Sequence, residues 1–433
     1  MKRKFEEILC HWKDNKRRKP LLVHGARQIG KTTTIRSFGE NHFEKMVYVN
    51  FERDRRLFKD FETDLSPAFL VKRLEIYFGE RINPASTLIF FDEIQACEQA
   101  LTSLKYFYEE APEYYIIGAG SLLGIAINRR QYSFPVGKVE QIRMFPMDME
   151  EFLWARGENL LAQEIRQCFA KQRAMDEVLH QKAMELYREY LMIGGMPEAV
   201  QVFVDSKSLI DAGEIQSDIL DAYVADMAKY ASGTETAKIM ACYDSIPSQL
   251  AKDNRKFQYK VVAKGGRASL FGTSIDWLLA SGVVVKCERV EQGQHPLAVF
   301  KNLAAFKLYM GDVGLLARKA GVRVYDIIGQ NDHVFIGALT ENYVADALLQ
   351  NGHVLYYWAA DSKNGGQAEV DFLLEQEDQV CPVEVKAREN VRSRSLNIFM
   401  KRYATSCGIR ISGRNFGLKD DILSIPLYSV FCL

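Results

Sequence analysis

Apolar and polar residues alternate along the first 150 residues in a pattern that predicts strands separated by helices. Short runs of consecutive apolar residues are typical of strands buried on both faces of a parallel sheet. Between these runs, apolar residues recur at the three- and four-residue spacing of amphipathic helices. The expected strands are a short run before Gly25 and residues 46–52, 88–91, 114–121 and 139–144. Residues 1–150 are therefore expected to form an α/β core, with a parallel sheet covered by helices on both faces.

The pattern changes to helices over residues 151–235, where apolar and charged positions alternate at helical spacing. Gly194, Gly195 and Pro197 should interrupt this helical lid. The simplest interpretation is that its charged faces point to solvent. Alternatively, a lid that packs on a bound ligand could contribute one of these charged residues to the site. Residues 236–305 then predict three helices followed by a pair of strands, which is the order of a winged helix.

The last segment, residues 306–433, predicts another α/β domain. A helix bearing Glu341 precedes a strand with Asp371, and the next strand contains Glu384 and Lys386. Acids on two adjacent strands can converge on one divalent cation. The plainer interpretation is that alternating strands carry charges outward for solubility, so the pattern alone leaves both open.

Composition limits the choice of function classes. With 433 residues, 48% hydrophobic and 26% charged, the chain should fold into two to four domains. Its formal net charge is zero, so binding to nucleic acid would have to rest on local patches. The eight cysteines lack metal-ligand spacing and are interpreted as reduced thiols. No run approaches the roughly 20 apolar residues of a membrane span, so a cytoplasmic protein without a membrane partner is expected.

The stretch HGARQIGKT fits the spacing GxxxxGK[ST] between a predicted strand and a predicted helix. Glycines at 25 and 30 would let backbone N–H groups surround phosphate, Lys31 would reach the β- and γ-phosphates, and Thr32 would coordinate Mg²⁺. The alternative is a Gly-rich turn that opens an amphipathic helix. The strand and helix on either side favour the phosphate loop.

A second motif, STLIFFDEIQ, places Asp92 and Glu93 at the carboxyl end of a buried strand, where open α/β sheets bind ligands. Asp92 would hold Mg²⁺, and Glu93 would orient or deprotonate the attacking water. Ser121 lies at the end of another predicted strand. It would either contact the γ-phosphate or the attacking water as a sensor residue, or simply cap the next helix.

These motifs, together with SFPVGKVE, FPMDMEEFL and YLMIGGMPEAV, resemble prokaryotic AAA-superfamily ATPases of the AAA_14 type that carry a DUF4143 domain at the carboxyl end. The resemblance covers nearly the whole chain and implies an ATP site that uses Mg²⁺. AAA proteins form assemblies, so a homo-oligomer is an expected partner. Arg129, Arg130 or Lys138 would then be candidates for an arginine finger, although a solvated loop is the simpler interpretation. The implied nucleotide contacts are Gly25, Ala26, Arg27, Gln28, Ile29, Gly30, Lys31, Thr32, Thr33 and Ser121.

In the last segment, the order of helix acid, strand acid and Glu-x-Lys resembles the PD-(D/E)xK nuclease fold. The resemblance implies Mg²⁺ or Mn²⁺ at Asp371 and Glu384, support from Glu341, and Lys386 beside the reacting water. Val370 replaces the usual proline. Two functions remain open: an ATP-driven enzyme that acts on nucleic acid, and a nucleotide-dependent switch or scaffold whose nuclease-like domain binds partners or DNA without cutting.

A local basic cluster in the predicted winged helix would bind phosphates, of DNA rather than RNA, without reading sequence. Alternatively, the winged helix only packs and its lysines keep it soluble. Phe257 and Tyr259 lie between the basic residues, which are Lys252, Arg255, Lys256, Lys260, Lys264 and Arg267.

Overall fold

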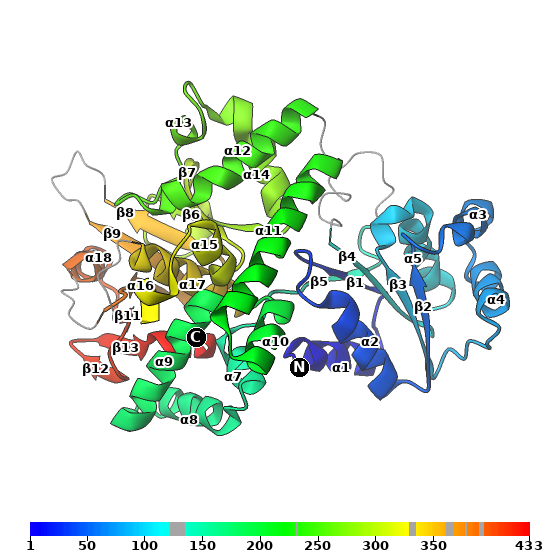
Figure 1. Ribbon diagram of the computed structural model, residues 1–433, viewed down its shortest axis with the longest axis horizontal. Helices are drawn as coiled ribbons and strands as arrows, with labels where there is room; N and C mark the ends of the chain where they lie inside the picture. Colours follow the sequence, from blue (N-terminus) through cyan, green and yellow to red (C-terminus); the bar gives the residue numbers. More distant parts are fainter. Residues whose placement is uncertain (122–134, 231–232, 329–334, 361–367, 377–378, 389–393) are drawn as a thin grey trace. The chain divides into compact units, whose positions relative to one another are not determined.

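The computed structural model describes residues 1–121, 135–230, 233–328, 335–360, 368–376, 379–388 and 394–433. The chain forms two compact units, an amino-terminal unit of residues 2–145 with 280–282, and a carboxyl-terminal unit made of the remainder (Figure 1). Each unit has its own sheet, and the two sheets differ in how their strands pair.

The amino-terminal unit is built on five strands in the order β2-β3-β4-β1-β5, and every pair is parallel. This confirms the predicted parallel sheet. The order places β4 between β1 and β3, so the carboxyl ends of these three strands meet at one edge. The strands are β1 (Leu21–His24), β2 (Lys45–Asn50), β3 (Thr87–Asp92), β4 (Tyr115–Gly120) and β5 (Glu140–Arg143).

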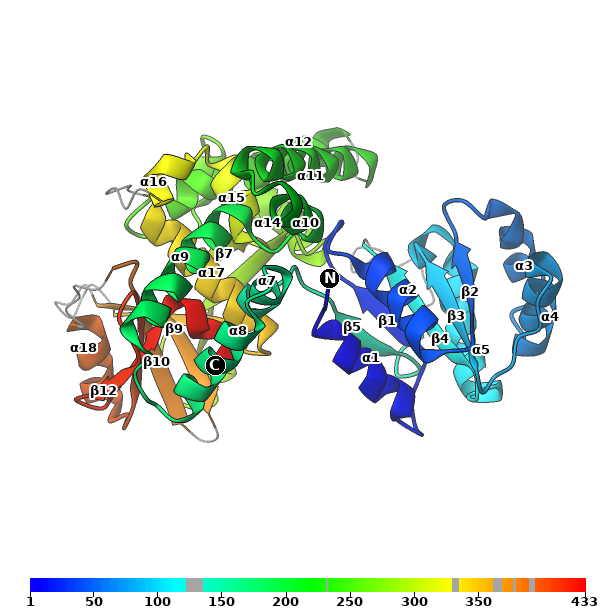
Figure 2. The ribbon, with the colours of Figure 1, turned by 60° about the horizontal axis from the view of Figure 1, so that its bottom comes forward.

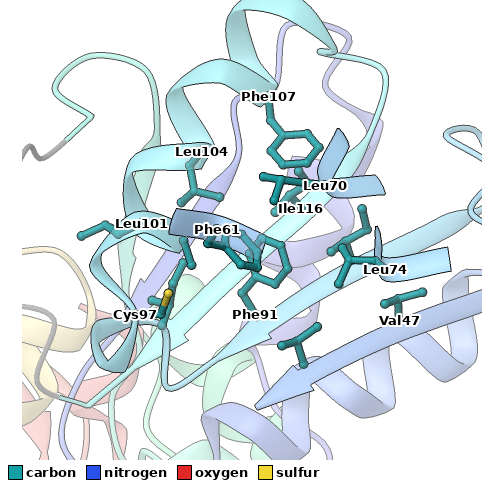
Figure 3. Close-up of a cluster of buried hydrophobic side chains, with 14 of the residues drawn as sticks. Val47, Phe61, Leu70, Leu74, Phe91, Cys97, Leu101, Leu104, Phe107 and Ile116 are labelled. Atoms are coloured by element: carbon teal, nitrogen blue, oxygen red, sulfur yellow. The ribbon is translucent and has the colours of Figure 1, made fainter. Parts of the chain in front are cut away.

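Helices cover both faces of this sheet, because its central strands β1, β3 and β4 are buried on both sides. On one face, α3, α4 and α5 enclose a core that contains Phe61, Phe91 and Phe107 (Figure 3). On the other face lie α1 and α2, where Trp12 contacts the ring of Tyr115 edge-on at 6.1 Å (Figure 2). The helices are α1 (Phe5–Asp14), α2 (Lys31–His42), α3 (Phe58–Thr63), α4 (Pro67–Phe78) and α5 (Glu98–Glu110).

The carboxyl-terminal unit begins with helices, as predicted. Helix α7 starts with a capping box, in which Asp148 and Glu151 each accept from the other's backbone N–H. The paired glycines break the helical run between α9 and α10. A Cβ at Gly195 would lie 1.9 Å from the carbonyl oxygen of Met147, so only glycine fits there. The helices are α7 (Met149–Ala155), α8 (Asn159–Ala170), α9 (Glu177–Ile193), α10 (Pro197–Ser206) and α11 (Leu209–Tyr230).

The rest of this unit is one mixed sheet of eight strands with helices around it (Figure 1). Its order is β12-β13-β11-β10-β9-β8-β6-β7. The strands are β6 (Val284–Val290), β7 (Lys301–Met310), β8 (Tyr356–Ala359), β9 (Glu369–Gln376), β10 (Gln379–Val385), β11 (Gly408–Ser412), β12 (Gly417–Lys419) and β13 (Ile422–Pro426). The helices are α12 (Gly233–Leu250), α13 (Tyr259–Val262), α14 (Ala268–Ala280), α15 (Val313–Lys319), α16 (Val324–Ile328), α17 (Ile336–Gln350) and α18 (Arg394–Tyr403).

This sheet corrects the predicted domain boundaries. The expected order of three helices and two strands is present as α12, α13, α14, β6 and β7. However, β6 also pairs in parallel with β8, so the expected winged-helix hairpin belongs to the same sheet as β9 and β10. The predicted boundary between residues 305 and 306 falls inside β7. Apart from residues 280–282, residues 151–235, 236–305 and 306–433 therefore belong to one unit rather than three.

Across the described ranges, every helix is too short or too polar to cross a bilayer.

Candidate nucleotide site and acidic site

The predicted phosphate loop connects β1 to α2. Gly25, Gln28 and Gly30 have positive φ angles of 147°, 64° and 88°, and the turn at Gly30 leads directly into the first residue of α2. A Cβ at Gly25 would lie 2.3 Å from the carbonyl oxygen of Met144. The glycines therefore permit a tight loop that ends at a helix N-terminus, where free N–H groups favour an anion.

Lys31 is the first residue of α2 and is 8% exposed. Its ammonium donates hydrogen bonds to the carbonyl oxygens of Gly25, at 3.0 Å, and Ala26, at 2.7 Å. Burial lowers the pKa of Lys31 to about 8, although Glu93 and Asp92 act in the opposite direction. Phosphate oxygens would form stronger, charge-assisted hydrogen bonds with this ammonium than neutral carbonyls do.

Asp92 ends β3 and is 3% exposed. The Thr32 hydroxyl donates to its carboxylate at 3.0 Å, which brings the two predicted Mg²⁺ ligands together. Tyr48, on the neighbouring strand β2, also donates to Asp92, at 2.8 Å, and the Asn50 amide lies 3.5 Å away. Sequence reasoning missed Tyr48 and Asn50, although their alternate positions at the end of β2 could have suggested them.

Glu93 follows directly and has a left-handed backbone with φ 49°. Its carboxylate accepts a 2.5 Å hydrogen bond from the Gln95 amide. Burial raises the pKa of Glu93, and the Gln95 hydrogen bond opposes this shift. Ser121 is buried just beyond β4, the strand between β1 and β3, so it lies at the same sheet edge as the phosphate loop and Asp92. Its predicted sensor role is compatible with that place but stays a prediction.

The other predicted loop contacts differ in exposure. Arg27, Gln28 and Thr33 are exposed, whereas Ala26 and Ile29 are buried. The carbonyl of Ile29 accepts a 2.9 Å hydrogen bond from the guanidinium of Arg3. Arg3 is itself 7% exposed, so a residue from the basic start of the chain helps to hold the loop.

Two of the three arginine-finger candidates, Arg129 and Arg130, lie outside the described residues. The third, Lys138, forms a 3.0 Å ion pair with Glu109 of the same unit. This contact favours the simpler interpretation of Lys138 as a surface residue.

In the carboxyl-terminal unit, β9 and β10 form the predicted antiparallel pair. Phe372 pairs with Val383, so Asp371 and Glu384 occupy the next opposed positions. Asp371 accepts a 2.8 Å hydrogen bond from the backbone N–H of Val385, and the Lys386 ammonium lies 3.3 Å from Glu384. The sheet thus brings Asp371, Glu384 and Lys386 together, as their spacing predicts.

Glu341 on α17 lies in a different environment. Its carboxylate is 1% exposed and accepts from Lys307 at 3.0 Å and Tyr309 at 2.5 Å. It is also ion-paired with Arg255. Lys307 forms a second ion pair, 2.6 Å long, with Glu369. Sequence reasoning missed Lys307, although one lysine within the apolar run AAFKLYM signals a buried, paired charge.

Comparison with family models matches three segments. Residues 17–153 match an AAA domain, AAA_14, and residues 336–429 match a domain of unknown function, DUF4143. The chain joins an AAA domain to a DUF4143 domain. This confirms the predicted resemblance at both ends, and the AAA domain lies largely within the amino-terminal unit. Residues 184–325 match another domain of unknown function, DUF8612. Comparison with curated proteins gave no match.

Several solved structures are similar to this chain. The Walker-type ATPase PABY2304 of Pyrococcus abyssi is 14% identical, with 73% of this chain and 95% of that chain covered and a TM-score of 0.45. The ORC2 protein of Aeropyrum pernix, with ADPNP and ADP, is 13% identical at 75% and 92% coverage and a TM-score of 0.38. The ORC1 protein of that organism, in complex with DNA, is 12% identical at 73% and 90% coverage and a TM-score of 0.29.

The acidic residues of the carboxyl-terminal unit fit a divalent cation only in part. One carboxylate oxygen of Glu384 is buried and has no hydrogen-bond partner among the described residues, and Asp371 faces it across the ladder. Two carboxylates are enough to hold Mg²⁺ with water. However, within the described ranges no group of three His, Cys, Asp or Glu residues is arranged to hold a metal. The predicted third member, Glu341, does not fit, because its carboxylate is already neutralised by Lys307 and Arg255.

The predicted basic cluster is divided by the fold. Phe257 is buried and stacks on Phe306 at 5.4 Å, so it is a packing residue rather than a platform for bases. Arg255 is occupied by Glu341. Lys256 is half-buried beside β7. The exposed remainder of the cluster is Lys252, Lys260, Lys264 and Arg267.

Proposed function

We propose that the AAA domain binds ATP with Mg²⁺ and hydrolyses it. The observation that carries this proposal is the convergence of Lys31, Thr32 and Asp92 at one edge of the sheet, with Glu93 next in the chain. Lys31 would exchange its carbonyl acceptors for the β- and γ-phosphates. Thr32 and Asp92 would hold Mg²⁺, which offsets the charge that develops on the phosphates.

Glu93 would position the attacking water and accept its proton. Its raised pKa brings it nearer to the range in which a general base works. In the present geometry one Glu93 oxygen is held by Gln95, so Glu93 would have to exchange that hydrogen bond for the water. Ser121 would complete the γ-phosphate contacts at the end of β4.

The test is ATP hydrolysis by the full chain and two variants, with nucleotide binding measured separately. Lys31→Ala should weaken binding and reduce hydrolysis by at least about 100-fold, because it removes the cation that stabilises the transferred charge. Glu93→Gln should retain binding but lose about 100-fold or more in hydrolysis. Unchanged hydrolysis by Glu93→Gln would refute the assignment of Glu93, and binding unaffected by Lys31→Ala would refute the whole site.

We infer that the carboxyl-terminal unit acts on nucleic acid, DNA rather than RNA, by binding it without cutting. The exposed cations Lys252, Lys260, Lys264 and Arg267 support an electrostatic contact with the backbone. The occupied carboxylate of Glu341 favours binding over cutting. If a divalent cation were held by Asp371 and Glu384, it would supply charge stabilisation and a more acidic water, and Lys386 lies beside Glu384.

Cleavage and binding should be measured on single- and double-stranded DNA and RNA, with Mg²⁺ or Mn²⁺ and with and without ATP. We expect salt-sensitive binding and intact substrates. Cleavage that disappears in Lys386→Ala and Asp371→Ala would overturn the non-cutting assignment and establish a nuclease.

A further inference from the structure

Two cysteines of the carboxyl-terminal unit lie beside each other on neighbouring strands. Cys381 belongs to β10, and Cys407 directly precedes β11. The two strands are parallel, and Val383 is opposite Ile409. Two residues earlier on each strand, Cys381 is therefore opposite Cys407, and their side chains project from the same face of the sheet.

The sulfur atoms of this pair are in direct contact. The Cys407 thiol donates a hydrogen bond to the Cys381 sulfur, and the two sulfur atoms are 3.1 Å apart. Neighbouring strands lie about 4.7–4.9 Å apart, which falls within the ~4.4–6.8 Å between Cα atoms that a disulfide requires. Small rotations of the two side chains would therefore be enough to join the sulfur atoms, without a movement of the backbone.

The fold holds the backbone on both sides of Cys407. The hydroxyl of the preceding Ser406 donates to the side-chain oxygen of Gln379 at 3.0 Å. The backbone N–H of the following Gly408 donates to the carbonyl oxygen of Asp421, also at 3.0 Å. Because the two thiols are held in contact, each has a high effective concentration for reaction with the other.

The two thiols differ in their access to solvent. Cys381 is 1% exposed, whereas Cys407 is half-buried. Burial raises the pKa of the Cys381 thiol, and its hydrogen bond with Cys407 acts in the same direction. An oxidant that arrives from solvent would therefore react first with Cys407, and Cys381 would react second, inside the protein.

We propose that Cys381 and Cys407 form a redox modification site, which hydrogen peroxide converts into an intramolecular disulfide. The Cys407 sulfur attacks one peroxide oxygen, the O–O bond breaks, and a sulfenic acid and one water form. The Cys381 sulfur then attacks the Cys407 sulfur and forms the S–S bond. The hydroxyl of the sulfenic acid leaves with the Cys381 proton as a second water. The two thiols together lose two electrons, and the peroxide gains them. A dithiol reductant reverses the reaction by thiol–disulfide exchange.

The disulfide would close a loop that contains the end of β10 and all of α18. Glu384 lies three residues after Cys381 on the same strand, so the link would restrain the strand that carries part of the acidic site. A covalent link of this kind stabilises a fold mainly because it restricts the unfolded chain. The inference is independent of both proposed functions, since it uses neither the nucleotide site nor a nucleic acid.

The experiment oxidises the full chain with hydrogen peroxide, alkylates the remaining thiols after unfolding, and maps the peptides by mass spectrometry without reduction. We expect one linked pair of peptides, which joins Cys381 to Cys407 and disappears after treatment with dithiothreitol. Cys407→Ser should lose the link. Cys381→Ala should leave Cys407 as a sulfenic acid, which a dimedone probe labels.

Cys10→Ser is the matched control. Cys10 is also half-buried, but its sulfur lies 3.8 Å from the ring of His42 rather than beside another thiol. This variant should form the link between Cys381 and Cys407 to the same extent as the wild type. Oxidation should also raise the urea midpoint of the carboxyl-terminal unit by about 1 M in the wild type and in Cys10→Ser, but not in Cys407→Ser.

Two results would overturn the proposal. One is peroxide treatment that oxidises Cys10 while Cys381 and Cys407 both remain open to alkylation. The other is oxidation of Cys407 to a sulfinic acid, or its linkage to a different cysteine, in the wild-type chain. Peptide mapping of the wild type needs no substitution, so the test holds even if a variant fails to fold, which circular dichroism would detect.

Discussion

The two buried lysines Lys31, in the AAA domain, and Lys307, in the carboxyl-terminal unit, differ in the groups that surround their ammonium ions. Lys31 donates to two neutral carbonyl oxygens, and burial lowers its pKa to about 8. Lys307 lies between the carboxylates of Glu341 and Glu369. The first cation is available for an anionic ligand, whereas the second is already neutralised by the protein.

The comparison separates a binding motif from an internal ion pair. A charged side chain that is buried against neutral dipoles costs folding free energy, and a ligand that supplies the missing charge recovers it. A charged side chain buried against its counter-ions is already compensated by the protein and gains no such stabilisation from a ligand. By this criterion we expect Lys31 to bind a ligand, and Glu341 and Lys307 to stabilise the fold as an internal ion pair.

Removal of Glu341 should give the largest effect on stability. Glu341→Ala would leave Lys307 and Arg255 without one shared carboxylate in a buried site. Loss of one partner of a buried pair costs about 3–5 kcal/mol. We expect the urea midpoint of the carboxyl-terminal unit to fall accordingly, as followed by tryptophan fluorescence.

The matched controls for this effect are Lys31→Ala and a double variant. Lys31→Ala should leave the urea midpoint of the amino-terminal unit unchanged or raise it, because it removes a buried charge whose hydrogen bonds go to neutral carbonyl oxygens. Glu341→Leu combined with Lys307→Met should recover part of the loss. A Glu341→Ala midpoint equal to that of the wild type would show that the ion pairs are not structural.

The pH dependence of nucleotide affinity should be the next largest effect. The pKa of Lys31 without ligand is about 8, so its ammonium is mostly charged at pH 7 and mostly neutral at pH 9. Affinity for ATP should therefore fall by about tenfold between these values. Lys31→Arg stays charged over this range. Fluorescent nucleotide titrations of both proteins measure the difference, and equal pH profiles would contradict the lowered pKa.

The smallest effect is expected at Tyr48. Tyr48→Phe removes one hydrogen bond to Asp92, worth about 1 kcal/mol, while it keeps the ring. The Mg²⁺ concentration for half-maximal hydrolysis should rise about fivefold. Tyr77→Phe, on the exposed surface of α4, serves as the control. An unchanged Mg²⁺ requirement would mean that Tyr48 does not orient Asp92.

The sequence was sufficient for the AAA domain because its signals are local. The phosphate loop, the buried strand before Asp92 and the alternation of strands and helices each lie within short stretches. Tyr48 and Asn50 were missed because their role depends on β2 lying beside β3, which a single stretch does not encode.

The carboxyl-terminal unit was harder to predict because its decisive contacts join distant residues. The facing of Asp371 and Glu384 was predictable from one hairpin. The pairing of β6 with β8 was not, because nearly seventy residues separate Glu288 from Tyr356. The ion pairs of Glu341 with Lys307 and Arg255 also depend on long-range packing, so the sequence could not show that this predicted metal ligand is already paired.

Two segments that match different family models contribute strands to the same sheet, and this limits how they can evolve. The DUF8612 match contains β6 and β7, and the DUF4143 match contains β8 to β13. If the later segment were transferred alone to another gene, β8 would lose its partner β6 and expose an unpaired edge. These two segments should therefore be found fused and change together during evolution, whereas the AAA domain, with its own sheet, is free to be exchanged.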